Sequence, residues 1–344
     1  MRQLVTIDQI RAAAKRIDNV AVYTPLVPLR RSSPPLLLKP ESLQPVGSFK
    51  LRGAYAAISA LPDDVRRRGV VAHSSGNHGH AVAYAAAVLG IPAVVVVPET
   101  APTAKTDAIL AYGAELVTVA PTMAAREAAS AELVERHGYT LVPPFDDPGV
   151  IAGQGTIGLE IMADRPDVDL IVVPVSGGGL ISGIATAARA INPDVTVVGV
   201  EPEFAADARD SLRTGERVAW PAASAQRTVA DALRVERIGE LPFAHMRRDV
   251  AGIVTVTDEQ MLAAVRRLAL AAHVVAEPGG AAAVAACLFR ADELPAARTR
   301  VAVVSGGNID PALLARVIGD PEYAGPAAPG RNEQPGAGPG PAGG

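Results

Sequence analysis

Residues 41–54 read Glu-Ser-Leu-Gln-Pro-Val-Gly-Ser-Phe-Lys-Leu-Arg-Gly-Ala and place Lys50 between a turn and an apolar helical run. Pro45 and Gly47 favour a turn, and the residues at 54–61 continue as a helix. A lysine in the first helical turn feels the partial positive charge of the helix end, which disfavours its ammonium form. A lowered pKa makes the neutral amine available to form an imine with a carbonyl compound. An ordinary surface lysine beside a turn is the alternative, so the rest of the chain has to decide.

Downstream of this stretch, short Val-rich segments alternate with helical patterns. Residues 70–73, 93–97 and 115–119 are each apolar enough for a buried strand. A second alternation follows, with strands expected at 170–175 and 300–304. Such alternation is typical of parallel sheets with helices on both faces. The sequence therefore predicts an α/β fold.

Turn residues at 143–148 (Pro-Pro-Phe-Asp-Asp-Pro) interrupt the alternation and indicate a hinge between two units. We expect a small α/β domain at 66–147, inserted into a large domain that is made of 1–65 and 148–320. A cleft is expected between the two domains. Residues 321–344 are dominated by Pro, Gly and Ala without periodicity, so a disordered tail is expected there.

The composition excludes several classes of function. A net charge of −4 without a dense basic stripe argues against nucleic acid or an anionic membrane as a partner. Cys287 is the only cysteine, which excludes an intrachain disulfide and a thiolate zinc cluster. Charges near the N-terminus argue against a secretory signal, and glycine and proline split the uncharged runs at 81–98 and 170–188. We therefore expect a cytoplasmic protein.

A glycine-rich loop follows the strand expected at 170–175. It reads Val-Ser-Gly-Gly-Gly-Leu-Ile-Ser-Gly over residues 175–183 and opens a helix. Consecutive backbone amides without side chains at a helix N-terminus can bind a phosphate dianion. A tight turn that needs glycine for steric reasons is an equally good interpretation of this loop on its own.

Three further polar loops follow strands or open helices: His-Ser-Ser-Gly-Asn-His-Gly at 73–79, Glu-Pro-Gly-Gly-Ala at 277–281 and Val-Ser-Gly-Gly-Asn-Ile at 304–309. In parallel sheets this edge binds ligands. Asn77 could also be a simple helix cap, and His78 and His80 lack a nearby third metal ligand. A reactive lysine, a phosphate loop and polar loops together describe a site for a phosphorylated aldehyde, and pyridoxal phosphate (PLP) fits that description.

From about residue 20 to about residue 319, the chain resembles the fold-type II PLP enzymes, a tryptophan synthase β-like fold with two domains. It looks most like the serine/threonine dehydratase and serine racemase family. The motifs occur in the family's order: Gly-Ser-Phe-Lys-Leu-Arg-Gly-Ala at 47–54, Ser-Ser-Gly-Asn-His-Gly at 74–79, Val-Ile-Ala-Gly-Gln-Gly-Thr at 150–156, the glycine loop and Ser-Gly-Gly-Asn at 305–308.

The resemblance implies that Lys50 carries PLP as a Schiff base and that Phe49 packs against its ring. Asn77 is expected to hydrogen-bond the phenolic oxygen, and Ser305 is expected to meet the pyridine nitrogen. A hydroxyl there, unlike a carboxylate, leaves the nitrogen largely unprotonated, which suits elimination. Backbone amides of four residues are expected to bind the phosphate: Gly177, Gly178, Gly179 and Leu180.

The implied reaction is β-elimination from L-threonine or L-serine, which gives a 2-oxo acid and ammonia. Lys50 is expected to remove the α-proton as general base. Ser74 and Asn77 are expected to hold the substrate carboxylate, and Phe145 to line the substrate space. Ser75 matches racemase-type loops, where a serine on the face opposite the lysine protonates the carbanion.

Two positions favour dehydration over racemisation, because the animal racemases carry Asn where Phe145 stands and Ser where Val235 stands. Racemisation of serine and elimination from threo-3-hydroxyaspartate remain alternatives, as do a PLP-binding regulatory protein and a β-replacement synthase. Two departures from the family leave the substrate open: Ser176 replaces a glycine of the phosphate loop, and Ala232 replaces a glycine that lies against the cofactor ring in relatives.

A divalent cation and a homodimer are also implied by the resemblance. Glu201-Pro-Glu-Phe-Ala-Ala-Asp207 matches the family's metal site. Glu201, the Ala205 carbonyl and Asp207 are the expected oxygen ligands, and such ligands suit Mg²⁺ or Ca²⁺. Solvated acids at a strand end are the alternative. The metal is expected to be structural because the segment lies away from the cofactor loops.

Overall fold

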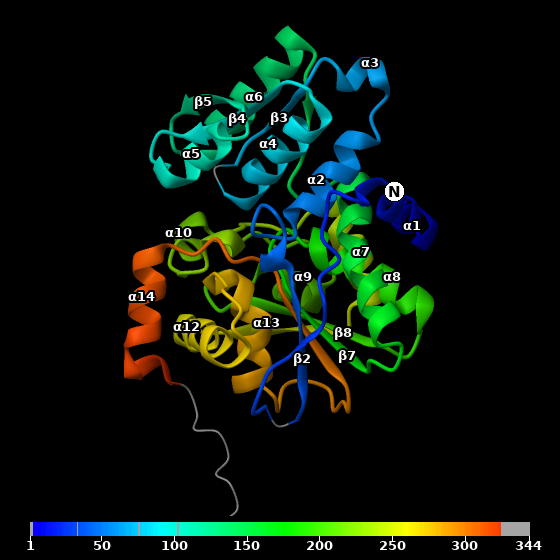
Figure 1. The fold of residues 1–344 in the computed structure, drawn as a ribbon, viewed down its shortest axis with the longest axis vertical. Coiled ribbons are helices and arrows are strands. Elements are labelled where there is room, and N and C mark those ends of the chain that lie inside the picture. Colours follow the sequence, from blue (N-terminus) through cyan, green and yellow to red (C-terminus); the bar gives the residue numbers. More distant parts are fainter. Residues whose placement is uncertain (1–2, 33, 75, 102, 325–344) are drawn as a thin grey trace, which may run out of the picture.

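The computed structural model describes residues 3–32, 34–74, 76–101 and 103–324. Within them the strands form two sheets (Figure 1), a large one of six strands and a small one of four. The large sheet has the order β1-β2-β10-β7-β8-β9, and only β1 and β2 run antiparallel. Its strands are β1 (Val27–Pro28), β2 (Leu36–Pro40), β7 (Leu170–Pro174), β8 (Thr196–Pro202), β9 (Gly252–Val256) and β10 (Arg300–Val304).

Alternate residues of the large sheet face opposite layers of helices, as a period of two requires. Val301 and Val303 of β10 pack with α7 (Pro148–Asp164) and α8 (Gly179–Ile191). Ala302 and Val304 of the same strand pack with α12 (Asp258–Arg267) and α13 (Pro278–Phe289). Burial on both faces explains why these strands are continuously apolar and confirms the expected α/β fold.

The small sheet has the order β5-β4-β3-β6 and is parallel throughout. One of its faces packs against α2 (Lys50–Ser59) and α4 (Asn77–Leu89), and the other packs against α6 (Met123–His137). In Figure 1 this sheet lies at the top of the view, above the large sheet. Its strands are β3 (Val70–Ala72), β4 (Ala93–Pro98), β5 (Glu115–Val119) and β6 (Thr140–Leu141).

The remaining helices connect and cover these layers. Among the described residues, no helix has both the length and the apolar character needed to cross a membrane. The other α-helices are α1 (Ile7–Ile17), α3 (Asp63–Arg66), α5 (Thr103–Leu110), α9 (Asp207–Thr214), α10 (Ala222–Ala225), α11 (Glu240–Asp249) and α14 (Pro311–Gly319). The short turns are η1 (Glu41–Leu43), η2 (Asp231–Leu233), the π-helical η3 (Leu268–Ala272) and η4 (Pro321–Ala324).

The C-terminal segment departs from the expectation at its start. Residues 321–324 form the turn η4, whereas we expected the tail to lack structure from residue 321. Tyr323 packs against the core cluster that contains α12 and α13, which gives this turn an apolar anchor. The rest of the expected tail, residues 325–344, lies outside the described residues.

Candidate active site

Lys50 is the first residue of α2, at the helix start that the sequence predicted. Its Nζ donates a hydrogen bond of 2.7 Å to the carbonyl oxygen of Pro144. Part of the side chain stays accessible, yet the surrounding protein lowers the pKa of the amine to about 8. The cause is desolvation by burial, whereas we had reasoned from the charge of the helix end. Lys50 can therefore supply a neutral amine near neutral pH.

The loop before Lys50 is bound to the loop after β10. Phe49 N donates to Ser305 O at 3.1 Å, Gly307 N donates to Gly47 O at 2.8 Å, and Ser48 forms an isolated bridge with Gly306. Backbone hydrogen bonds thus hold Ser305 beside the residues that lead into α2. Ser305 is almost fully buried.

Asn77 begins α4, and its side chain bridges two other loops. Its Nδ2 donates to Glu277 Oε1 at 2.6 Å, and its Oδ1 accepts from Asn308 Nδ2 at 2.7 Å. Glu277 immediately precedes α13, and Asn308 follows β10. Three of the four polar loops that the sequence singled out therefore meet at one place, at the carboxyl ends of the strands.

The glycine loop begins α8 and is buried. Gly178 has a φ of +87°, a conformation that favours glycine, and a Cβ atom on Gly177 would overlap the ring of Phe145. Among the described residues, no acceptor is found for the backbone N–H groups of Gly177, Gly178, Gly179 and Leu180. Buried donors at a helix N-terminus without an acceptor suit an anion such as a phosphate.

Phe145 connects this loop to Lys50. Its ring lies against Gly177 and its backbone against Gly179, while the preceding residue Pro144 accepts the Lys50 hydrogen bond. The segment that we interpreted as a hinge thus passes between the lysine and the glycine loop. The structure brings together the residues that the sequence predicted for a cofactor site.

The serine loop at residues 73–79 also belongs to this site. Ser74 is partly buried, and its hydroxyl accepts from Gly76 N at 3.3 Å. Ser75, expected to act on the face opposite Lys50, lies outside the described residues. His78 Nε2 lies 2.7 Å from Val142 O, and burial lowers the pKa of this imidazole to about 3. His78 is therefore neutral, in agreement with a structural role.

Of the three expected metal ligands, Glu201 lies on β8, Ala205 lies in the turn that follows, and Asp207 begins α9. Glu201 accepts from Ala208 N at 3.0 Å and from Arg209 N at 2.8 Å, and Asp207 accepts from Ile238 N at 2.7 Å. Burial raises the pKa of Glu201 well above its usual value and that of Asp207 to about 7. Within the part of the chain that the structure describes, no three His, Cys, Asp or Glu side chains cluster as a metal site. A nearby cation would nevertheless stabilise the charged forms of these two carboxyls.

A buried charge network lies behind Lys50, and the sequence did not reveal it. Arg52 donates to Glu41 at 2.7 and 2.9 Å and to Glu160 at 2.5 and 3.0 Å. Lys39 Nζ lies 2.6 Å from Glu160 Oε2. Apart from Lys50, Arg52 and Glu41 are the charged residues of the stretch 41–54, and this isolation was the signal that could have predicted their pairing.

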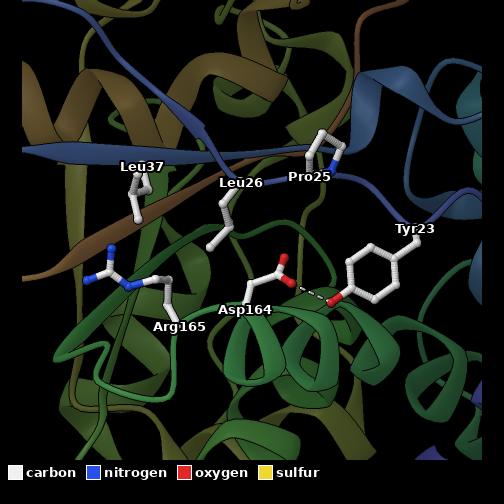
Figure 2. A pocket seen from close by; sticks show the side chains of 6 residues that line it. All are labelled: Tyr23, Pro25, Leu26, Leu37, Asp164 and Arg165. Atoms are coloured by element: carbon white, nitrogen blue, oxygen red, sulfur yellow. Dashed lines mark hydrogen bonds between the residues drawn. The ribbon is translucent and has the colours of Figure 1, made fainter.

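A surface pocket opens at the outer edge of this network (Figure 2). The Tyr23 hydroxyl donates to Asp164 at 2.7 Å, and the Tyr23 ring lies 4.9 Å from Lys39 Nζ. The pocket contains neither Lys50 nor a glycine loop, so it is separate from the candidate active site. Its lining residues are Tyr23, Pro25, Leu26, Leu37, Asp164 and Arg165.

Comparisons with known proteins agree with this geometry. Residues 17–306 match the family described as "Pyridoxal-phosphate dependent enzyme". The chain is 42% identical to L-threonine ammonia-lyase of Thermotoga maritima, over 92% of this chain and 78% of that protein. It is 37% identical to L-threo-3-hydroxyaspartate ammonia-lyase of Saccharomyces cerevisiae, over 92% and 97% of the two chains.

A solved structure of maize serine racemase is similar as well, with a TM-score of 0.87 and 36% identity over 91% of this chain and 97% of that one. The arrangement of sheets and helices is therefore that of the fold-type II PLP enzymes. The residues present fit the cofactor. A lysine of lowered pKa can react with its aldehyde, and buried backbone amides without an acceptor among the described residues can bind its phosphate. The match over most of the chain, together with this fit, places the protein in the family of pyridoxal-phosphate-dependent enzymes.

Proposed function

We propose that this protein is an ammonia-lyase that converts L-threonine, L-serine or both into a 2-oxo acid and ammonia. The 42% identity to an L-threonine ammonia-lyase over 92% of the chain is the observation that carries this proposal. In the net reaction the β-hydroxyl leaves as water, and a water molecule later releases the amino group as ammonia. Elimination from threo-3-hydroxyaspartate is the nearest alternative, supported by the similar yeast enzyme.

Lys50 is the residue we assign to the cofactor aldehyde, and the four orphan amides of the glycine loop are assigned to the phosphate. Phe49 lies beside Lys50, with its ring centroid 5.0 Å from Nζ, and is assigned to the face of the cofactor ring. Asn77 is assigned to the phenolic oxygen and Ser305 to the pyridine nitrogen. When bound, PLP supplies an electron sink for the pair that remains at the α-carbon after its proton leaves.

Lys50 is also the base in this proposal. With a pKa of about 8, about a tenth of the amine is neutral at pH 7, whereas an ordinary lysine is almost entirely protonated there. A neutral amine can accept the α-proton of the substrate. The Pro144 carbonyl accepts from Nζ at 2.7 Å and so orients the lysine amine when it is not joined to the cofactor. Ser74 and the backbone N–H of Asn77 are assigned to the substrate carboxylate, and Phe145 to the wall of the substrate space.

The test is an assay of 2-oxo acid formation with L-threonine, L-serine and L-threo-3-hydroxyaspartate, each added separately to the purified PLP-loaded protein. We expect oxo acid from threonine or serine at a rate well above that from hydroxyaspartate. A higher rate with hydroxyaspartate would show that hydroxyaspartate, and not threonine or serine, is the preferred substrate. If no substrate yielded oxo acid although the cofactor band was present, the proposed reaction would be wrong.

Racemisation is the second candidate, because Ser75 follows Ser74 and the fold resembles maize serine racemase. In racemisation, Ser75 would return a proton to the α-carbon of the substrate on the face opposite Lys50. Ser75→Ala should then reduce D-serine formation far more than oxo acid formation. Equal losses in both rates would exclude a proton-donor role for Ser75. Ser224→Ala, which removes a hydroxyl from another part of the chain, is the control for nonspecific effects.

We propose that Glu201, Asp207 and the Ala205 carbonyl hold Mg²⁺ or Ca²⁺. The two carboxyls are buried and their pKa values are raised, so a cation would favour their charged forms. Added Mg²⁺ or Ca²⁺ should raise the temperature of unfolding, and Asp207→Asn should abolish the increase. An equal increase in that variant would exclude this site. A homodimer is also proposed from the resemblance, and a sedimentation mass equal to one chain would contradict it.

A further inference from the structure

Glu277 is a buried acid to which the proposed reaction assigns no task. Its side chain is 4% exposed, and it immediately precedes α13 on the large-sheet side of the site. Asn77, at the start of α4, donates to its Oε1 at 2.6 Å. A Cβ atom on Gly306 would overlap this carboxyl oxygen and approach Asn77 Nδ2 at 3.3 Å. Glycine at 306 therefore leaves the space in which the carboxyl and the amide meet.

The neighbours of Asn77 fix which end of its amide points where. Asn308 Nδ2 donates to Val46 O at 2.9 Å, and a carbonyl oxygen can only accept. The same Nδ2 donates its other hydrogen to Asn77, so the Asn77 atom facing it is the oxygen. The amide nitrogen of Asn77 must then face Glu277, whose ionised carboxylate accepts only. One N–H of Asn77 is thereby committed to Glu277. Among the described residues no acceptor is found for the second, which remains for a ligand.

We propose that Glu277 is a positioning residue, which holds the Asn77 amide so that its second N–H donates to the phenolic oxygen of the cofactor. The inference rests on the assignment of Asn77 to that oxygen, and it adds the acid that gives Asn77 its orientation. Without Glu277, Asn308 alone holds the amide of Asn77, so the second N–H is directed less firmly at the phenolic oxygen. The affinity for PLP and the absorbance of the bound cofactor should both depend on Glu277.

The charges around Glu277 make its hydrogen bond with Asn77 sensitive to pH. Burial, with a smaller contribution from the charge of Asp231 on η2, raises the pKa of Glu277 to about 7. The hydrogen bond from Asn77 and the charge of Lys105 on α5 act in the opposite direction. Lys105 and Asp231 form an ion pair of 2.5 Å with each other. The ionised form of Glu277 is the better acceptor, so the contact should strengthen as the pH rises through about 7.

The experiment compares the wild-type protein with Glu277→Ala and Glu277→Gln. Apo-protein is titrated with PLP, and the Kd and the absorbance spectrum of the loaded protein are recorded from pH 6 to 8.5. Glu277→Ala should weaken PLP binding about tenfold and shift the absorbance, since one oriented hydrogen bond is lost. Glu277→Gln keeps an acceptor oxygen, so its Kd should stay within about threefold of wild type. It should lose the pH dependence near pH 7, while the dependence near pH 8 that is caused by Lys50 stays.

Two further variants separate positioning from a general effect on the fold. In the double variant Asn77→Ala/Glu277→Ala, the second change should add almost nothing to the loss caused by Asn77→Ala. Additive losses would overturn the proposal, as would a Glu277→Ala protein with the wild-type Kd and spectrum. Asp231→Asn is the matched control, because it removes a neighbouring charge without a contact to Asn77. At pH 8.5, where Glu277 is ionised in both proteins, its spectrum should match that of the wild type. These readouts do not depend on oxo acid formation, so this inference and the proposed function can fail separately.

Discussion

Lys50 and Arg52 lie two residues apart in the first turn of α2, and their surroundings are opposite in kind. Arg52 is 1% exposed and has two carboxylates as partners, so burial, which would lower its pKa, is outweighed and the pKa is raised. Lys50 has one neutral carbonyl as its hydrogen-bond acceptor, and burial lowers its pKa to about 8. The same helix turn thus carries one cation whose charge is compensated and one whose charge is not.

The difference separates a structural cation from a chemical one. Arg52 and Lys39 bring two positive charges that balance those of Glu41 and Glu160, so the network is neutral as a whole. A buried charge that loses its partner is costly, which keeps such a network closed and holds α2 in place. Lys50, in contrast, can change its protonation state at moderate cost, because no anion among the described residues pairs with it. The predictions that follow test this contrast, starting with the largest effect.

Replacement of Lys50 should have the largest effect on function. Lys50→Ala removes both the amine that binds the cofactor aldehyde and the base, so oxo acid formation should fall at least about a thousandfold. Lys50→Arg keeps the positive charge but offers no neutral amine, and it should be equally inactive. The absorbance of added PLP should be that of the free aldehyde in both variants. Activity retained in the arginine variant would contradict the assignment.

Replacement of Arg52 should mainly affect stability. Arg52→Met leaves Glu41 and Glu160 buried with only Lys39 to compensate them, so the free energy of unfolding should drop by about 3–5 kcal/mol. Urea unfolding of the apo-protein measures this directly. Arg136→Met, which breaks an exposed pair with Glu132, should leave the urea midpoint unchanged. Equal behaviour of the two variants would remove the distinction between the buried network and an ordinary surface pair.

Replacement of Gly177 should affect the phosphate loop alone. The added Cβ of Gly177→Ala would overlap the Phe145 ring, so the loop or the ring must move, and PLP should bind about tenfold more weakly. Gly252→Ala is the matched control, because nothing lies within 4 Å of a Cβ there. If the two variants bound PLP equally well, the glycine loop would have no part in binding the phosphate.

The pH dependence of cofactor uptake should give the smallest effect. A lowered pKa means that the neutral Lys50 amine forms as the pH rises through about 8, so the rate of imine formation by the apo-protein should rise with pH. Between pH 7 and pH 8 the neutral fraction increases about fivefold, and the rate should follow it. Stopped-flow absorbance at a fixed PLP concentration measures the rate. A midpoint above pH 10 would mean that Lys50 is an ordinary lysine.

Much of the site could be predicted from local patterns. The strands at 115–119 and 300–304 have the predicted bounds, because the short Val-rich run that marks each strand is visible within the segment itself. Lys50 and the glycine loop were recognisable for the same reason, since a turn and a run of glycines are local signals. The residues that the loops bring together could be expected once the sheets were known to be parallel.

Contacts between distant segments could not be predicted in this way. The hairpin β1-β2 was missed because β1 is two residues long and β2 is completed by β10 at the other end of the chain. The acceptor role of Glu277 was missed because its partner lies in another loop, and the sequence offered only a Glu-Pro-Gly-Gly turn. The cause of the lowered Lys50 pKa was also misjudged, since burial depends on the whole fold.

The pairing of β2 with β10 has a consequence for how the chain folds during synthesis. The small sheet is built from one continuous stretch, from β3 to β6, so its pairings can form as soon as that stretch has left the ribosome. Strand β2 emerges earlier, yet its parallel neighbour β10 is among the last strands to be made. The leucines of β2 must therefore wait for their parallel neighbour until nearly the whole protein exists.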